Sequence, residues 1–143
     1  MPRVTLKHAR RPLEVRRNSA GVPQIEASNW LDALYGLGYL HGIDRPTQML
    51  FQRVVACGRA CELLSDQPLW LERDRFFRRA GLYVGLTEEL DELSAQTRQE
   101  LESYCAGVND GLRHARRSLG MQLLKKQNTD WTPEAILLVG KLL

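Results

Sequence analysis

Three glycines inside one helical pattern are the strongest constraint on how this 143-residue chain folds. Apolar residues recur at helical spacing from Trp30 to Leu40. Gly36, Gly38 and Gly42 lie within or just after this stretch. A glycine in a helix interior costs about 1 kcal/mol relative to alanine, so the pattern predicts close packing against another element. A cofactor loop is the alternative, but the third glycine and the preceding strand of a dinucleotide fingerprint are missing.

The N-terminal residues before this helix predict a small antiparallel β element. Val4–Leu6 and Leu13–Val15 alternate apolar and polar residues, which is the period of a half-buried strand. Pro23–Ala27 has the composition of a third extended piece. The intervening Asn18–Gly21 has turn chemistry, because Asn and Gly tolerate positive φ.

Several capping signals predict that the rest of the chain is mainly helical. Ser28 and Asn29 are N-cap candidates for the first helix. A break is expected at Pro46, because the residue before a proline avoids the α region, and Asp44 is a candidate cap for the following helix. Further helices are predicted over residues 48–54, 70–82, 94–119 and 133–143.

Charge and hydropathy are ordinary for a globular protein, with a net charge of +3 and 43% apolar residues. Basic residues cluster in Lys7–Arg17, in Arg113–Arg117 and at Lys125 and Lys126. We expect solvated surface there, since no nucleic-acid motif accompanies them. No apolar stretch approaches the roughly 20 residues that span a bilayer. Neither nucleic acid nor membrane is therefore an expected partner, and a cytoplasmic location is expected, with the periplasm as alternative.

No self-contained active site is predicted. No serine lies in a Gly-x-Ser-x-Gly elbow. His41 and Asp44 share a helical face; a local hydrogen bond at the helix end is favoured over a general-base pair. Cys57 and Cys61 would also share a helical face, and together with Cys105 they are predicted to be buried free thiols rather than metal ligands. No cofactor or metal is expected in this segment.

The last predicted helix is almost wholly apolar. Thr132 is its expected N-cap and Pro133 its first residue. A helix with apolar residues on all sides belongs inside a larger structure. Residues 1–143 are therefore predicted to be a single incomplete domain, with residue 143 a truncation or processing point.

Six blocks, in order along the chain, resemble the penicillin acylase family. They are Val15–Ala27, Asp32–Met49, Gly58–Leu63, Asp74–Leu82, Tyr104–Asn109 and Trp131–Pro133. Asn18 stands where the family usually has aspartate, and Gln24 where it has histidine. The motif residues expected to be structural are Gly21, Pro23, Gly38, Asp44, Arg45, Gln48, Gly58 and Asn109.

The resemblance implies the mainly α, α-chain portion of an N-terminal-nucleophile hydrolase with an αββα core. In such enzymes a precursor cuts itself into α and β chains. The new N-terminal serine of the β chain attacks an amide, with its own amine as base. The implied reaction is hydrolysis of the carbon–nitrogen bond of linear amides, in antibiotic or other acyl-amide metabolism. The implied partners are the β chain, which is absent here, and a small amide substrate.

The resemblance also implies individual roles. Leu142 would lie near a residue that lines the acyl pocket, and no residue of this chain matches the catalytic nucleophile. Calcium is possible in the complete enzyme, with its carboxylate beyond Leu143. Asp44 and Arg45 are expected to orient the helix junction through an ion pair or a cap. The alternative reading is a non-catalytic helical interaction module derived from an acylase α segment.

Overall fold

The computed structural model describes residues 4–6, 13–115 and 130–143. The chain is mostly helical with one small sheet, as predicted. Its contacts group into two compact units. Unit 1 comprises Met1–Arg45 and Ala95–Ala115, and unit 2 comprises Pro46–Ser94 and Arg116–Leu143. The single incomplete domain expected from the sequence stays a prediction.

The sheet of unit 1 confirms the predicted β element. Strands β1 (Val4–Leu6), β2 (Leu13–Arg17) and β3 (Pro23–Glu26) pair antiparallel in the order β1-β2-β3. In β2, Leu13 and Val15 are buried while the residues between and after them are half-buried. This alternation is the one that the sequence showed.

Helix α1 (Trp30–Asp44) begins where the sequence predicted. The side chain of Asn29 accepts a hydrogen bond from the backbone N–H of Asp32 at 2.9 Å, which is N-cap geometry. The helix ends at Asp44, where the N–H of Arg45 donates to the carbonyl of His41 at 2.9 Å. Arg45 therefore separates α1 from the next helix, and the predicted break at the proline is confirmed.

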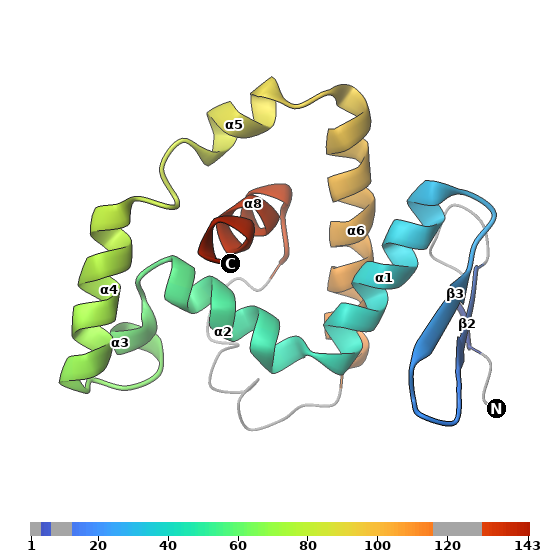
Figure 1. Ribbon diagram of the computed structural model, residues 1–143, viewed down its shortest axis with the longest axis horizontal. Coiled ribbons are helices and arrows are strands. Elements are labelled where there is room, and N and C mark those ends of the chain that lie inside the picture. Colours follow the sequence, from blue (N-terminus) through green and yellow to red (C-terminus); the bar gives the residue numbers. More distant parts are fainter. Residues whose placement is uncertain (1–3, 7–12, 116–129) are drawn as a thin grey trace. The chain divides into compact units, whose positions relative to one another are not determined.

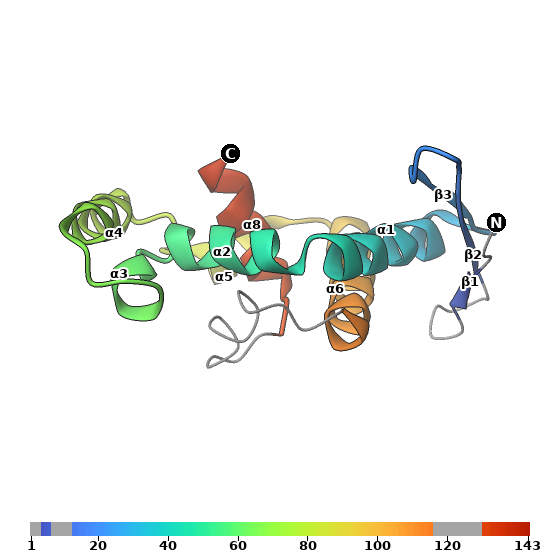
Figure 2. The same ribbon diagram turned by 90° about the horizontal axis from the view of Figure 1, so that it is seen from below.

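Helix α6 (Ala95–His114) crosses α1 at four glycines, two from each helix. The two helices lie side by side in both views (Figures 1 and 2). A Cβ atom on Gly42 would lie 2.9 Å from the backbone nitrogen of Leu112, closer than real Cβ atoms come. A Cβ on Gly107 would lie 2.9 Å from the backbone nitrogen of Tyr39. The predicted close packing is confirmed, and its partner is α6.

The described part of unit 2 contains five helices. They are α2 (Pro46–Ala56), α3 (Ala60–Leu63), α4 (Pro68–Ala80), α5 (Leu86–Glu92) and α8 (Pro133–Leu142). Helix α8 packs against α2 and α5. Its N-cap is Thr132, whose hydroxyl accepts from the N–H of Ala135 at 3.4 Å, as predicted. Helix α4 ends two residues earlier than expected because Gly81 takes a left-handed conformation with φ of 67°.

Some predictions concern residues outside the described ranges. Most of the basic clusters, and the last turn of the helix predicted to Leu119, lie outside them. Within the described ranges, no helix has both the length and the apolar character needed to span a bilayer.

The crossing of α1 and α6 yields a stability prediction. Gly42→Ala should lower the free energy of unfolding by about 2 kcal/mol or more, because the added methyl group meets backbone that cannot move aside alone. Gly140→Ala is the matched control, since nothing lies within 4 Å of a Cβ there. That helical replacement should be neutral or stabilising by up to about 1 kcal/mol. Urea unfolding of both variants checks the pair; equal effects would contradict the close crossing.

Candidate functional site

Arg17 joins the turn after β2 to the end of α1. One guanidinium nitrogen, Nη2, lies 2.7 Å from both carboxylate oxygens of Asp44, and Nη1 donates to the carbonyl of Gly21 at 3.0 Å. The pair is partly exposed, so its contribution to stability is at most about 1 kcal/mol. Its main effect is geometric, because it brings together Gly21 and Asp44, two residues singled out from the sequence.

The turn between β2 and β3 is held by Asn18. Its side-chain oxygen accepts from the N–H groups of Ala20 at 3.0 Å and Val22 at 2.9 Å. A single amide oxygen makes both bonds, which explains why asparagine serves where the family usually has aspartate. Gly21 has a positive φ of 79°, and Pro23 starts β3. Both motif residues therefore shape the backbone.

A buried polar cluster joins α1 to α6 beside the glycines. The hydroxyl of Tyr35 donates to the carboxylate of Asp110, and Arg113 binds the same carboxylate. Asp110 is only 8% exposed. Burial first, and the hydrogen bond to Asp110 second, raise the pKa of Tyr35. Asn109, another predicted motif residue, is half-buried next to this cluster.

His41 faces α6 rather than the end of its own helix. Its Nδ1 lies 2.8 Å from the hydroxyl oxygen of Tyr104, and the two rings meet edge to face. The predicted local bond to Asp44 is therefore wrong, because Arg17 binds that carboxylate. Burial, and then the charge of Arg45, lower the pKa of His41. Burial raises the pKa of Tyr104 to about 12.

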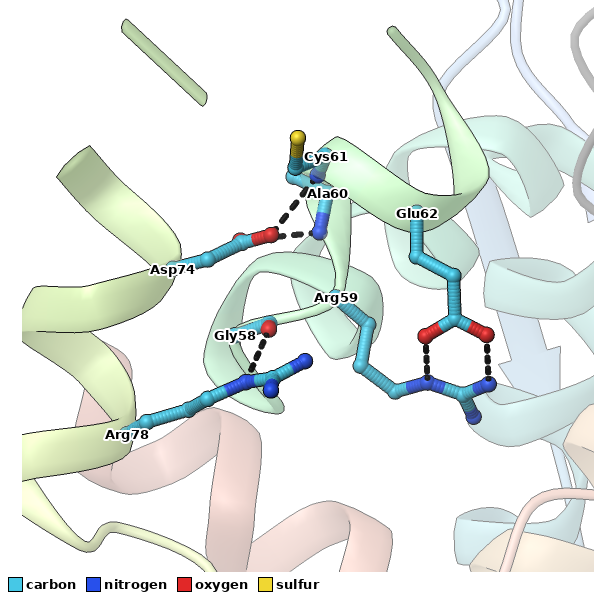
Figure 3. A network of polar contacts seen from close by, with 7 residues as sticks. All are labelled: Gly58, Arg59, Ala60, Cys61, Glu62, Asp74 and Arg78. Carbon is cyan, nitrogen blue, oxygen red and sulfur yellow. Dashed lines mark hydrogen bonds and ion pairs between the residues drawn. The ribbon is translucent and has the colours of Figure 1, made fainter. Parts of the chain in front are cut away.

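A second cluster of polar contacts in unit 2 surrounds Gly58 (Figure 3). Asp74 on α4 is 4% exposed, and its carboxylate accepts from the N–H groups of Ala60 at 2.8 Å and Cys61 at 2.7 Å. Arg78, one turn further along α4, donates from Nε to the carbonyl of Gly58 at 2.7 Å. These contacts hold the start of α3 against α4. They bring together the third and fourth sequence blocks.

Gly58 makes this corner possible. Its φ is 61°, and a Cβ there would lie 2.7 Å from the carbonyl oxygen of Asp74. The left-handed turn separates α2 from α3, so the expectation that Cys57 and Cys61 share one helical face is wrong. Both thiols are half-buried, while Cys105 is buried as predicted.

The remaining predicted residues lie elsewhere. Arg45 and Gln48 are exposed at the start of α2. The carboxylate of Asp44 binds Arg17, and its predicted role as the cap of α2 stays a prediction. Leu142 is half-buried and packs against both apolar clusters of unit 2, around Leu50 and Leu138. Its role in substrate binding stays a prediction.

The polar groups of Arg17, Asp110 and Asp74 bind other side chains or backbone, which is the pattern of a scaffold. Within the ranges that the structure describes, no group of three or more His, Cys, Asp and Glu could hold a metal ion. Sequence reasoning missed the contacts of Arg17 with Asp44 and of Tyr35 with Asp110, because these partners lie 27 and 75 residues apart along the chain.

The Gly58 corner yields a second prediction. Asp74→Ala should lower the free energy of unfolding by about 3 kcal/mol, because two backbone N–H groups lose a charged acceptor. Asp74→Asn should cost less, since one oxygen remains. Glu62→Ala, which removes the exposed pair with Arg59, should change the free energy of unfolding far less. Chemical denaturation ranks the three variants, and a loss for Glu62→Ala as large as for Asp74→Ala would refute the assignment.

The buried His41 predicts a pH dependence of stability. Its pKa in the folded state is below the ordinary 6.5, so the unfolded state binds the proton first as pH falls. The contribution is complete above 6.5 and is lost as pH falls below it. His41→Gln should flatten the slope of unfolding free energy between about pH 7.5 and about pH 5.5. Tyr104→Phe should keep most of the slope, because burial is the largest cause. An unchanged slope in His41→Gln would count against this account.

The sequence of the chain is similar to those of known proteins. Its sequence matches the penicillin amidase family over residues 12–143. The acyl-homoserine lactone acylase QuiP of Pseudomonas aeruginosa is 37% identical over 133 residues, which are 92% of this chain and 16% of that protein. The penicillin acylase 2 proenzyme of a Pseudomonas species is 38% identical over 98 residues, 68% of this chain and 12% of that protein. The chain thus spans about a sixth or less of the length of these curated relatives.

The fold agrees with the sequence match. A thermostable penicillin G acylase from Alcaligenes faecalis superposes with a TM-score of 0.75 at 23% identity, over 95% of this chain and 70% of that chain. At this identity the likeness shows the fold alone, which this chain shares with that penicillin G acylase. Because the family match extends over almost the whole sequence and the fold is shared, this chain belongs to the penicillin amidase family.

Proposed function

We propose that this chain is the N-terminal segment of an acylase that hydrolyses the carbon–nitrogen bond of linear amides. The observation that carries the proposal is the family match over residues 12–143, joined to relatives that are themselves named acylases. In the proposed reaction the acyl group passes to the N-terminal serine of a β chain and then to water. The word proenzyme in one relative's name fits a precursor that is processed.

The proposed contribution of this segment is support. An N-terminal nucleophile that uses its own amine as base works only if the surrounding chain holds both groups within hydrogen-bond reach of the substrate. Backbone packed directly on backbone, as at Gly42 and Gly107, gives a rigid support. The buried carboxylates of Asp110 and Asp74 fix helices in the same way, within one unit each.

The proposed substrate is an amide with an apolar acyl group. The relatives' names point to acyl-homoserine lactones and penicillins, and in both the scissile bond joins an acyl group to an amine. Leu142 is the residue of this chain proposed to line the acyl pocket, because its half-buried side chain retains some exposed surface. Antibiotic or other acyl-amide metabolism is the proposed setting, and the β chain is the proposed partner.

Expression of the whole precursor tests this function. Intact mass and N-terminal sequencing should show two chains, the second starting with serine, and replacing that serine by alanine should leave the precursor uncut. The processed protein should release amine from an N-acyl homoserine lactone or a phenylacetyl amide, and residues 1–143 alone should release none. An uncut protein that hydrolyses no amide would instead support the non-catalytic interaction module.

A further inference from the structure

Helix α1 carries an outward stripe of apolar side chains besides the face that meets α6. Trp30, Leu34 and Leu37 recur at positions i, i+4 and i+7, so they lie on one side of the helix. Trp30 is 63% exposed and Leu37 39% exposed, and Leu34 is half-buried. We call these three residues the α1 stripe. Large aromatic side chains are mostly buried in folded proteins, so an exposed tryptophan here is informative.

The other sides of α1 are already occupied. Its glycine face meets α6 backbone to backbone, at Gly38 and Gly42. Another side faces the sheet, where a Cβ on Gly36 would lie 3.0 Å from the side chain of Ile25 and 3.2 Å from that of Leu13. A helix with apolar residues on every side is typical of the interior of a larger protein. Among the described residues of unit 1, the α1 stripe is the side of α1 with the exposed apolar side chains Trp30 and Leu37.

The α1 stripe is also free of charge. The only charged residue from Trp30 to Leu40 is Asp32, which is 1% exposed and hydrogen-bonded to Asn29. The stripe therefore offers about three helical turns without an exposed charge. Helix α4 differs, because its exposed apolar side chains alternate with exposed arginines. Such a mixed surface stays solvated readily, whereas an uncharged stripe favours a dry, apolar contact.

We propose that the β chain of the same precursor covers the α1 stripe. This inference rests on the proposed function. The match covers 16% of the QuiP relative's length, so a protein of that kind has ample further chain to cover the stripe. The occupant presents uncharged apolar side chains at helical spacing or along one strand. Trp30 is its anchor, since tryptophans contribute disproportionately to binding energy in interfaces.

Photo-crosslinking in the full-length precursor tests the location. Leu37 is replaced by p-benzoylphenylalanine, and the matched control carries the same residue at Val22, which is 55% exposed in the β2–β3 turn. Peptide mass mapping should find crosslinks from position 37 to the β chain and none of these from position 22. Crosslinks from position 37 only to the α chain, only to a second copy, or to nothing would overturn the proposal.

Charge insertion tests the chemistry of the contact. Leu37→Glu should reduce the yield of the two-chain protein about tenfold or more, because a charge is then enclosed without a partner. Leu37→Met should keep the yield, and so should Val22→Glu. A normal yield of two-chain protein from Leu37→Glu would contradict an apolar contact at the α1 stripe. Amide hydrolysis by the unsubstituted protein tests the proposed function separately. If the protein hydrolyses amides but the expected crosslink is missing, only this inference is contradicted. If the crosslink forms but no amide is hydrolysed, only the proposed function is contradicted.

Discussion

The backbone contact between α1 and α6 is the constraint on which unit 1 depends. Gly38 and Gly42 meet Gly107 and Gly111, and no side chain larger than hydrogen fits at any of the four positions. Each glycine weakens an isolated helix by about 1 kcal/mol. The close approach offsets this by bringing long side chains of one helix onto polar groups of the other. Tyr35 reaches Asp110 in this way, and His41 approaches Tyr104.

In unit 2, a buried carboxylate holds helices together in place of a glycine crossing. Here one buried carboxylate, Asp74, replaces the missing intrahelical partners at the start of the short helix α3. Gly58 supplies the left-handed turn that lets α3 approach α4. The contacts in both units are between groups that satisfy each other. These contacts agree with the proposed supporting role of the chain, and the exposed α1 stripe is the surface proposed to contact a partner.

Local signals in the sequence predicted much of the fold. Alternation predicted the strands, side-chain caps predicted the helix starts after Asn29 and Thr132, and glycine content predicted a close crossing. These features depend on residues within a few positions of one another. Long-range partners were not predictable in this way. The local rule paired Asp44 with His41, but Arg17, 27 residues away, makes two charged hydrogen bonds to that carboxylate instead.

The candidate site shows the same division. Gly21 and Gly58 have positive φ, and Gly38 lies against the backbone of α6. The contacts of Arg17 with Asp44 and of Asp110 with Tyr35 were found only in the structure. The central claim is that this segment supports a nucleophile it does not contain. Trapping the acyl-enzyme of the full-length protein and mapping the adduct by peptide mass tests it most directly. We predict the acyl group on the N-terminal residue of a chain that starts after residue 143. An adduct on any residue from 1 to 143 would contradict the account.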